Sequence, residues 1–170
     1  MRIKYVKRYL LFCMAGALFF FAAYVLGFRI NISPSTPRGL WLIQPHTAFG
    51  VGDFVSVSPH GNPGYAFALE RGFFRPNSVM LKLIIAAEGD LVDYDYYERA
   101  ITVNGHHISA TQILPYDSQG RPLFPASFPV TLSGQQVWLS SEFIRGFDSR
   151  YFGPVYSGAL TKAVPVWVFR

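Results

Sequence analysis

The sequence predicts a mainly β, antiparallel domain behind one N-terminal transmembrane helix. Two observations support this prediction. An uncharged, strongly apolar run occupies residues 9–28, and the chain after it alternates short Val-, Tyr- and Phe-rich stretches with turn-forming residues. The chain contains 15 glycines and 12 prolines among 170 residues, which favours short strands joined by turns over long helices.

The apolar run is long enough to cross the hydrocarbon core of a bilayer as a helix. It is preceded by four basic residues, Arg2, Lys4, Lys7 and Arg8. Because basic residues favour the cytoplasmic side, we expect residues 1–8 in the cytoplasm, 9–28 in the membrane and 29–170 outside. A cleaved secretory signal is the alternative, but its apolar core is usually shorter and ends at small residues. Here the bulky Phe28 ends the run.

The net charge of +5 comes mainly from this N-terminal cluster. Eleven of the fifteen basic residues remain after it, against ten acidic residues, so the rest of the chain is nearly neutral. Such a balance gives no electrostatic footprint for DNA or RNA, and no nucleic-acid partner is expected. The single cysteine, Cys13, excludes an intramolecular disulfide.

Short β-like stretches follow the apolar run. Strands are predicted at residues 40–43, 53–57, 79–86, 91–94, 101–103, 136–140 and 164–169. The pair Asn104-Gly105 predicts a two-residue hairpin turn after one of them. Residues 58–77 and 114–129 resist assignment and are predicted to be surface loops or small insertions.

The first candidate for chemistry is Ser35, in the sequence Ser33-Pro34-Ser35-Thr36-Pro37. Proline fixes φ, so this loop is predicted to be stiff. A stiff loop suits a nucleophile because the hydroxyl oxygen and the backbone N–H of Ser35 stay in one geometry. The alternative is a plain linker.

The second candidate is Lys82, whose neighbours on both faces of the predicted strand 79–86 are apolar. Burial of a lysine lowers its pKa by up to about 3–5 units from about 10.4, because the charged form loses hydration. Such a lysine can act as a neutral base near pH 7. The alternative is an edge-strand lysine that discourages aggregation.

The third candidate cluster is Asp148-Ser149-Arg150, in which we expect an Asp148–Arg150 ion pair that supports a loop. The alternative is a direct role in proton transfer. The histidines show no zinc-type spacing and are predicted to be solvated: His46, His60, His106 and His107. Because none suits a Ser-His-Asp triad, a Ser-Lys dyad is the more economical serine chemistry. Neither a metal nor another cofactor is expected.

Four features occur in order along the chain: the apolar run, Ser35-Thr36-Pro37-Arg38-Gly39-Leu40-Trp41, Lys82 ahead of Glu88-Gly89-Asp90, and Asp148-Ser149-Arg150-Tyr151-Phe152-Gly153-Pro154-Val155. In this order and spacing they resemble the type I signal peptidase superfamily. The nearest resemblance is to its TraF-like branch, the peptidases of conjugative transfer systems. It extends over essentially the whole chain.

The resemblance implies a signal-peptidase-like β domain in the periplasm, held by a single span in the bacterial inner membrane. Ser35 would attack a peptide carbonyl while Lys82 accepts its proton. Ser33 and the backbone N–H of Ser35 would form the oxyanion hole. The residues implied to support the site are Asp148, Ser149 and Arg150.

The implied substrate is a membrane-tethered precursor of the propilin type, with small residues before the scissile bond. Other proteins of the conjugation system are implied partners. An acyl-enzyme can pass to water or to an amine, so hydrolysis and cyclisation of the product both stay open.

Two departures from the family pattern affect this interpretation. Signal peptidases carry a serine two residues before the aspartate, where it hydrogen-bonds the lysine, and here that position is Gly146. Lys82 must then be oriented by another group, for which Ser140 and Ser141 are candidates; the alternative is reduced activity. The second departure is Glu88 in place of the proline of a Pro-Gly-Asp turn.

Gly146 keeps a second hypothesis open, a catalytically silent assembly factor of a pilus or secretion system. A general signal peptidase is the third hypothesis. The small domain and the x-Pro-x-Gly form of the serine motif favour the transfer branch over it.

Overall fold

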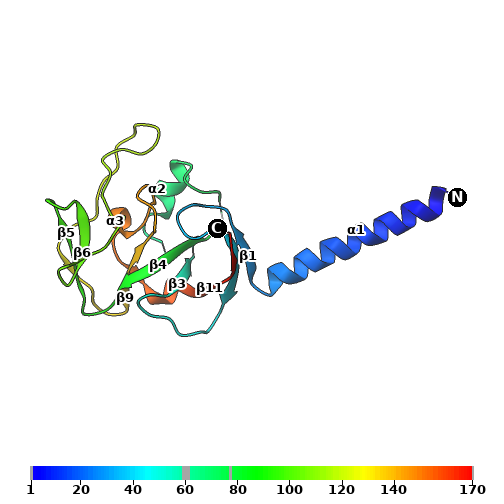
Figure 1. Cartoon of the computed structure of the whole chain (residues 1–170), viewed down its shortest axis with the longest axis horizontal. Helices are drawn as coiled ribbons and strands as arrows, with labels where there is room; N and C mark the ends of the chain where they lie inside the picture. Colours follow the sequence, from blue (N-terminus) through cyan, green and yellow to red (C-terminus); the bar gives the residue numbers. More distant parts are fainter. Residues whose placement is uncertain (1, 59–61, 77, 170) are drawn as a thin grey trace.

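The computed structural model describes residues 2–58, 62–76 and 78–169. It consists of one long helix and a mainly β domain, which confirms the predicted fold class (Figure 1). Helix α1, Arg2–Val25, extends away from the domain. Its segment Tyr5–Val25 is exposed and, by length and composition, apolar enough to cross a membrane.

The helix is shorter at its C-terminal end than the predicted span 9–28. It ends at Val25, and Gly27 adopts a left-handed conformation with φ of 95°. This conformation redirects the chain from the helix toward the sheet. Phe28 therefore already belongs to strand β1, Phe28–Asn31. Hydrophobicity alone therefore places the C-terminal end of the helix too far along the chain.

The larger sheet contains seven antiparallel strands in the order β1-β2-β11-β3-β4-β9-β10. After β1 these are β2 (Gly39–Gln44), β11 (Leu160–Val168), β3 (Phe54–Val57), β4 (Met80–Ala86), β9 (Gln136–Ser140) and β10 (Val155–Tyr156). Strand β4 pairs with β3 on one side and β9 on the other. The strand that carries Lys82 is therefore flanked on both sides.

The smaller sheet has four strands in the order β7-β6-β5-β8. Their bounds are His106–His107 (β7), Ala100–Val103 (β6), Leu91–Asp95 (β5) and Val130–Thr131 (β8). Asn104 and Gly105 join β6 to β7 with φ of 51° and 81°. Two positive φ values are typical of a type I′ turn, so the predicted hairpin is confirmed.

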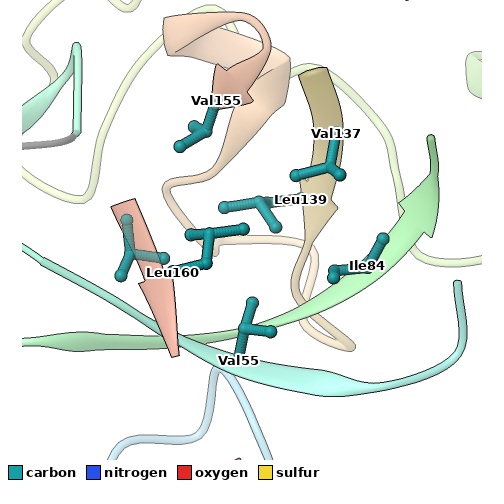
Figure 2. Close-up of a cluster of buried hydrophobic side chains, with 7 residues drawn as sticks. Val55, Ile84, Val137, Leu139, Val155 and Leu160 are labelled. Atoms are coloured by element: carbon teal, nitrogen blue, oxygen red, sulfur yellow. The ribbon is translucent and has the colours of Figure 1, made fainter. Parts of the chain in front are cut away.

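Two buried clusters fill the domain. The first, between strands of the larger sheet, contains Val55, Val57, Ile84, Val137, Leu139, Val155 and Leu160 (Figure 2). The second joins β4 and β9 to the smaller sheet and contains Ala86, Val92, Ile101, Leu132 and Trp138. Since β4 and β9 contribute to both clusters, they are the shared framework of the domain.

Strands are confirmed at all seven predicted places, although β11 begins at Leu160, earlier than expected. The short elements were missed because they cover too few residues to show a period. These are β1, β8, β10, helix α2 (Tyr65–Glu70), helix α3 (Ser149–Phe152) and the 3₁₀ turn η2 (Ser157–Ala159). Residues 59–61, and with them His60, lie outside the described residues.

Candidate active site

Ser35 lies in the loop between β1 and β2, and the side chain of Asn31 holds this loop. Asn31 Nδ2 donates to both oxygens of Thr36 and to the carbonyl of Pro37 at 2.9–3.1 Å. Its Oδ1 accepts from the backbone N–H of Ser33 at 3.0 Å. Asn31 was not predicted from the sequence, although an Asn two residues before a serine is typical of an Asx turn.

The hydroxyl groups of Ser33 and Ser35 are hydrogen-bonded to each other, with 2.9 Å between their Oγ atoms. The backbone N–H of Ser35 also donates to Ser33 Oγ, at 3.3 Å. Ser33 is exposed and Ser35 is half-buried. A hydroxyl beside a backbone N–H is an arrangement that can stabilise a developing oxyanion.

Lys82 lies on β4 opposite Val55 of β3, with 2% of its surface exposed. Burial lowers the pKa of Lys82 from 10.5 to about 8, against the opposing effect of the Asp148 charge; the charge of Arg150 adds to the lowering. The apolar neighbours in the sequence predicted this direction. A neutral amine is therefore available close to neutral pH.

Of the two serines expected beside Lys82, Ser141 is its partner. Ser141 Oγ accepts a hydrogen bond from Lys82 Nζ at 3.0 Å and donates to Asp148 Oδ2 at 2.6 Å. The backbone N–H of Ser141 also donates to this carboxylate oxygen, at 2.9 Å. The hydroxyl of Ser140 instead donates to the carbonyl of Ser141 at 3.4 Å.

Asp148 and Arg150 form the expected ion pair. Arg150 donates from Nε to Oδ1 and from a terminal nitrogen to Oδ2 of Asp148, both at 2.8 Å, and both residues are fully buried. Burial would raise the pKa of Asp148, but the charge and hydrogen bonds of Arg150 hold it below its ordinary value. Asp148 therefore remains a carboxylate, linked to Lys82 through one hydroxyl.

The rest of the Arg150 guanidinium binds the surrounding backbone. It donates at 2.7–3.2 Å to the carbonyls of Gln112, Phe143, Ile144 and Gly146. Ser149, the third expected supporting residue, makes a different contact. Its hydroxyl accepts from the N–H of Leu139 at 3.0 Å and so fastens α3 to β9.

Ser33, Ser35 and Lys82 all line one cavity of about 730 Å³. Among the described residues, Ser35 and Lys82 are not hydrogen-bonded to each other; Ser35 is bonded to Ser33 and Lys82 to Ser141. The structure therefore brings the candidate nucleophile and the candidate base to the same cavity, without a hydrogen bond between them. Asp148, Ser149 and Arg150 lie behind this space rather than on its wall.

Aromatic side chains form much of the cavity wall. Phe147 stacks on Tyr151 with 5.6 Å between ring centroids, and Phe73 lies 5.3 Å from Phe147. The loop 114–123 completes this side, and its Asp117 is paired with Arg121 at 2.7 Å. This part of the wall is thus mainly apolar.

The last turn of α1 also reaches the cavity. Tyr24 of α1 and Arg29 of β1 are both part of its lining. The Arg29 guanidinium lies 3.8 Å from the centroid of the Tyr24 ring and donates to the Tyr24 carbonyl at 2.7 Å. This contact joins the helix to the domain at the edge of the cavity.

The described histidines lie away from the cavity. His46, His106 and His107 are exposed, and His107 pairs with Asp95 at 3.0 Å. Within the part of the chain that the structure describes, no group of His, Cys, Asp and Glu side chains is arranged to hold a metal ion.

Comparison with known proteins places the chain in a family. The sequence pattern of "Signal peptidase, peptidase S26" matches residues 2–168. The chain belongs to the signal peptidase family. This membership confirms the resemblance that the ordered motifs predicted.

Relatives within the signal peptidase family include proteins named for conjugal transfer. "Conjugal transfer protein TraF" of Agrobacterium fabrum (strain C58 / ATCC 33970) is 34% identical over 151 residues, 84% of each chain. The protein of the same name from Agrobacterium tumefaciens (strain 15955) is 33% identical over 96% of this chain and 98% of its own. "Plasmid transfer protein TraF" of Escherichia coli is 34% identical over 79% of this chain and 78% of its own.

Among solved structures, a signal peptidase I from Enterococcus faecalis V583 is similar, with a TM-score of 0.41 and 16% sequence identity. The match covers 73% of this chain and 98% of that chain.

Proposed function

We propose that this chain is a membrane-anchored serine endopeptidase in which Ser35 is the nucleophile and Lys82 is the general base. The observation that carries the proposal is the shared cavity, where an accessible serine and a buried lysine of lowered pKa face the same space. Membership of the signal peptidase family supports peptidase chemistry.

In the proposed reaction, neutral Lys82 takes the proton of the Ser35 hydroxyl as its oxygen attacks the substrate carbonyl carbon. Ser33 Oγ turns from Ser35 Oγ and, with the Ser35 N–H, stabilises the oxyanion. The C–N bond then breaks, and protonated Lys82 returns its proton to the leaving amine. A second nucleophile releases the acyl group from Ser35.

The proposed substrate is a membrane-tethered, propilin-like precursor in conjugative transfer. The names of the TraF relatives support this context. Helix α1 would anchor the enzyme in the bacterial inner membrane with its N-terminus in the cytoplasm, and the domain would act in the periplasm. Water as acyl acceptor gives a linear product, and the amine of the substrate's own N-terminus gives a cyclic one.

The test is processing of a co-expressed conjugative propilin by the wild type, Ser35→Ala and Lys82→Ala, with product masses read by mass spectrometry. We expect the wild type to shorten the precursor and both variants to leave it intact. A product lighter than the linear chain by one water identifies cyclisation. Processing by both variants at the wild-type rate would contradict the dyad.

Labelling with a serine-reactive acylating probe separates this proposal from a silent assembly factor, which would give no adduct on Ser35. The hydrogen bond from Lys82 to Ser141 favours the enzyme, because Gly146 no longer implies an unoriented lysine. Rescue of bulk secretion in a host depleted of its own signal peptidase would instead indicate a general signal peptidase.

A further inference from the structure

Position 146 is a glycine because another side chain already fills the space where its own would lie. A Cβ built on Gly146 would collide with Oγ of Ser141 and would lie 2.6 Å from Ser141 Cβ. Real Cβ atoms essentially never come so close to a neighbour. A side chain at 146 and the present side chain at 141 therefore exclude each other.

The hydroxyl in this space has two fixed partners, one on each side. Ser141 donates its only proton to Asp148 Oδ2 at 2.6 Å, so toward Lys82 it can only accept. A neutral amine has two N–H groups and one lone pair. With one N–H held by Ser141, the amine is oriented, and its lone pair is free for a proton from the cavity side.

We infer that Ser141, which directly follows β9, is the positioning residue of Lys82 and takes the place of the serine that the signal peptidase pattern puts at position 146. The Ser141 hydroxyl thus occupies the space that a side chain at position 146 would fill. This inference rests on the proposed function, since it concerns the orientation of the proposed base.

The surroundings of Ser141 are built to keep its hydroxyl in place. Ser141 is 2% exposed, and its backbone N–H shares the Asp148 oxygen that its hydroxyl binds. Asp148 is in turn held by two bonds from the Arg150 guanidinium and one from the Arg150 backbone N–H. Ser141 is absent from the cavity lining, so it acts on Lys82 from behind and does not touch the substrate.

The first test is Ser141→Ala in the full-length protein. The substitution removes the hydroxyl but leaves Asp148 paired with Arg150 and with the backbone N–H of residue 141. We expect kcat for a peptide spanning the mapped cleavage site to fall about 10²-fold, because a misplaced base reacts poorly. KM should stay within about twofold, since Ser141 lies outside the cavity wall.

The matched control is Ser140→Ala, which deletes a neighbouring buried hydroxyl that is not bonded to Lys82. Its kcat should equal that of the wild type. If Ser141 had only a structural role, the substitution would lower the amount of folded enzyme and therefore the total activity. The value of kcat, calculated per Ser35 that reacts with an acylating probe, would then stay at the wild-type level.

The decisive variant exchanges the two positions, Ser141→Gly with Gly146→Ser. Glycine at 141 is needed because even an alanine Cβ would collide with a side chain at 146. We expect kcat of the double variant to be at least about tenfold higher than kcat of Ser141→Gly alone, because a hydroxyl returns to the same space. Gly146→Ser alone should be inactive or unfolded.

The outcomes separate the two proposals. If the wild type processes its substrate and Ser35→Ala does not, but Ser141→Ala turns over like the wild type, the inference about Ser141 is wrong and the proposed function stands. If the wild type forms neither product nor Ser35 adduct, the proposed function fails, and the positioning role fails with it.

Discussion

The two halves of the candidate site are built in opposite ways. The lysine half is closed: Lys82, Asp148 and Arg150 are each at most 2% exposed, the Ser141 hydroxyl links Lys82 to Asp148, and Arg150 binds Asp148 directly. The serine half is an open loop in which Ser33 is exposed and Ser35 half-buried. A base needs desolvation and fixed orientation, whereas a nucleophile must remain open to its substrate. Each half has the surroundings that its proposed role requires.

We expect the closed lysine half to contribute more to the stability of the folded chain than the open serine half does. Arg150→Met leaves the Asp148 carboxylate buried without its counter-ion and should lower the free energy of unfolding by about 3–5 kcal/mol. Denaturant unfolding in detergent, followed by the signals of buried Trp41 and Trp138, measures this loss. Arg145→Met, an exposed arginine of the same segment, is the control and should change it by less than about 0.5 kcal/mol. Equal effects of the two substitutions would contradict the proposed support.

The open half should show the reverse behaviour. Ser33→Ala removes the hydroxyl beside the Ser35 N–H and should lower the rate of Ser35 acylation by about 10²-fold if it stabilises the oxyanion. Because Ser33 is exposed, stability should change by less than about 0.5 kcal/mol. The control is Ser109→Ala, an exposed serine outside the cavity. An unchanged acylation rate for Ser33→Ala would remove Ser33 from the oxyanion hole.

The acylation rate should depend on pH through Lys82. With a pKa of about 8, the neutral amine becomes scarcer by about tenfold for each pH unit below this value. The rate of Ser35 acylation should therefore rise with pH and level off above about pH 8. A profile that still rises towards pH 10.5 would mean that Lys82 keeps its ordinary pKa.

Stability provides a second measurement of the same ionisation. Between about pH 8 and pH 10.5 the folded chain binds fewer protons at Lys82 than the unfolded chain, so the free energy of unfolding should rise with pH in this window. Lys82→Met retains the apolar packing but lacks this group. The pH slope of the wild type should exceed that of the variant over the window.

The smallest expected effect concerns Asn31, which holds the open loop from within. Asn31→Ala should lower the acylation rate only about two- to tenfold, because its hydrogen bonds compete with water. Asn31→Asp keeps the acceptor for the Ser33 N–H and loses the donors to Thr36, which separates the two groups of bonds. A loss as large as that of Ser33→Ala would show that the open loop depends on Asn31 more than on its prolines.

The same contrast explains how much of the molecule could be predicted from the sequence. The apolar strand around Lys82 indicates burial, and the prolines around Ser35 indicate a stiff loop, because both signals are local. The role of Ser141 could not be assigned, since Ser140 has the same residue type and the choice depends on how β9 meets Asp148. The Asn31 bonds and the short strands β1 and β10 likewise depend on tertiary pairing.

The contact between Tyr24 and Arg29 has a consequence for how a substrate is found. Because the last turn of α1 forms part of the cavity wall, the binding space is not contained in the β domain alone. With α1 embedded in a bilayer, this space would lie at the lipid surface, and a precursor in the same leaflet would search for it in two dimensions. Shared confinement raises the effective concentration of a weakly bound partner without a new contact. A soluble fragment lacking α1 would lose both this confinement and the part of the cavity wall that Tyr24 forms.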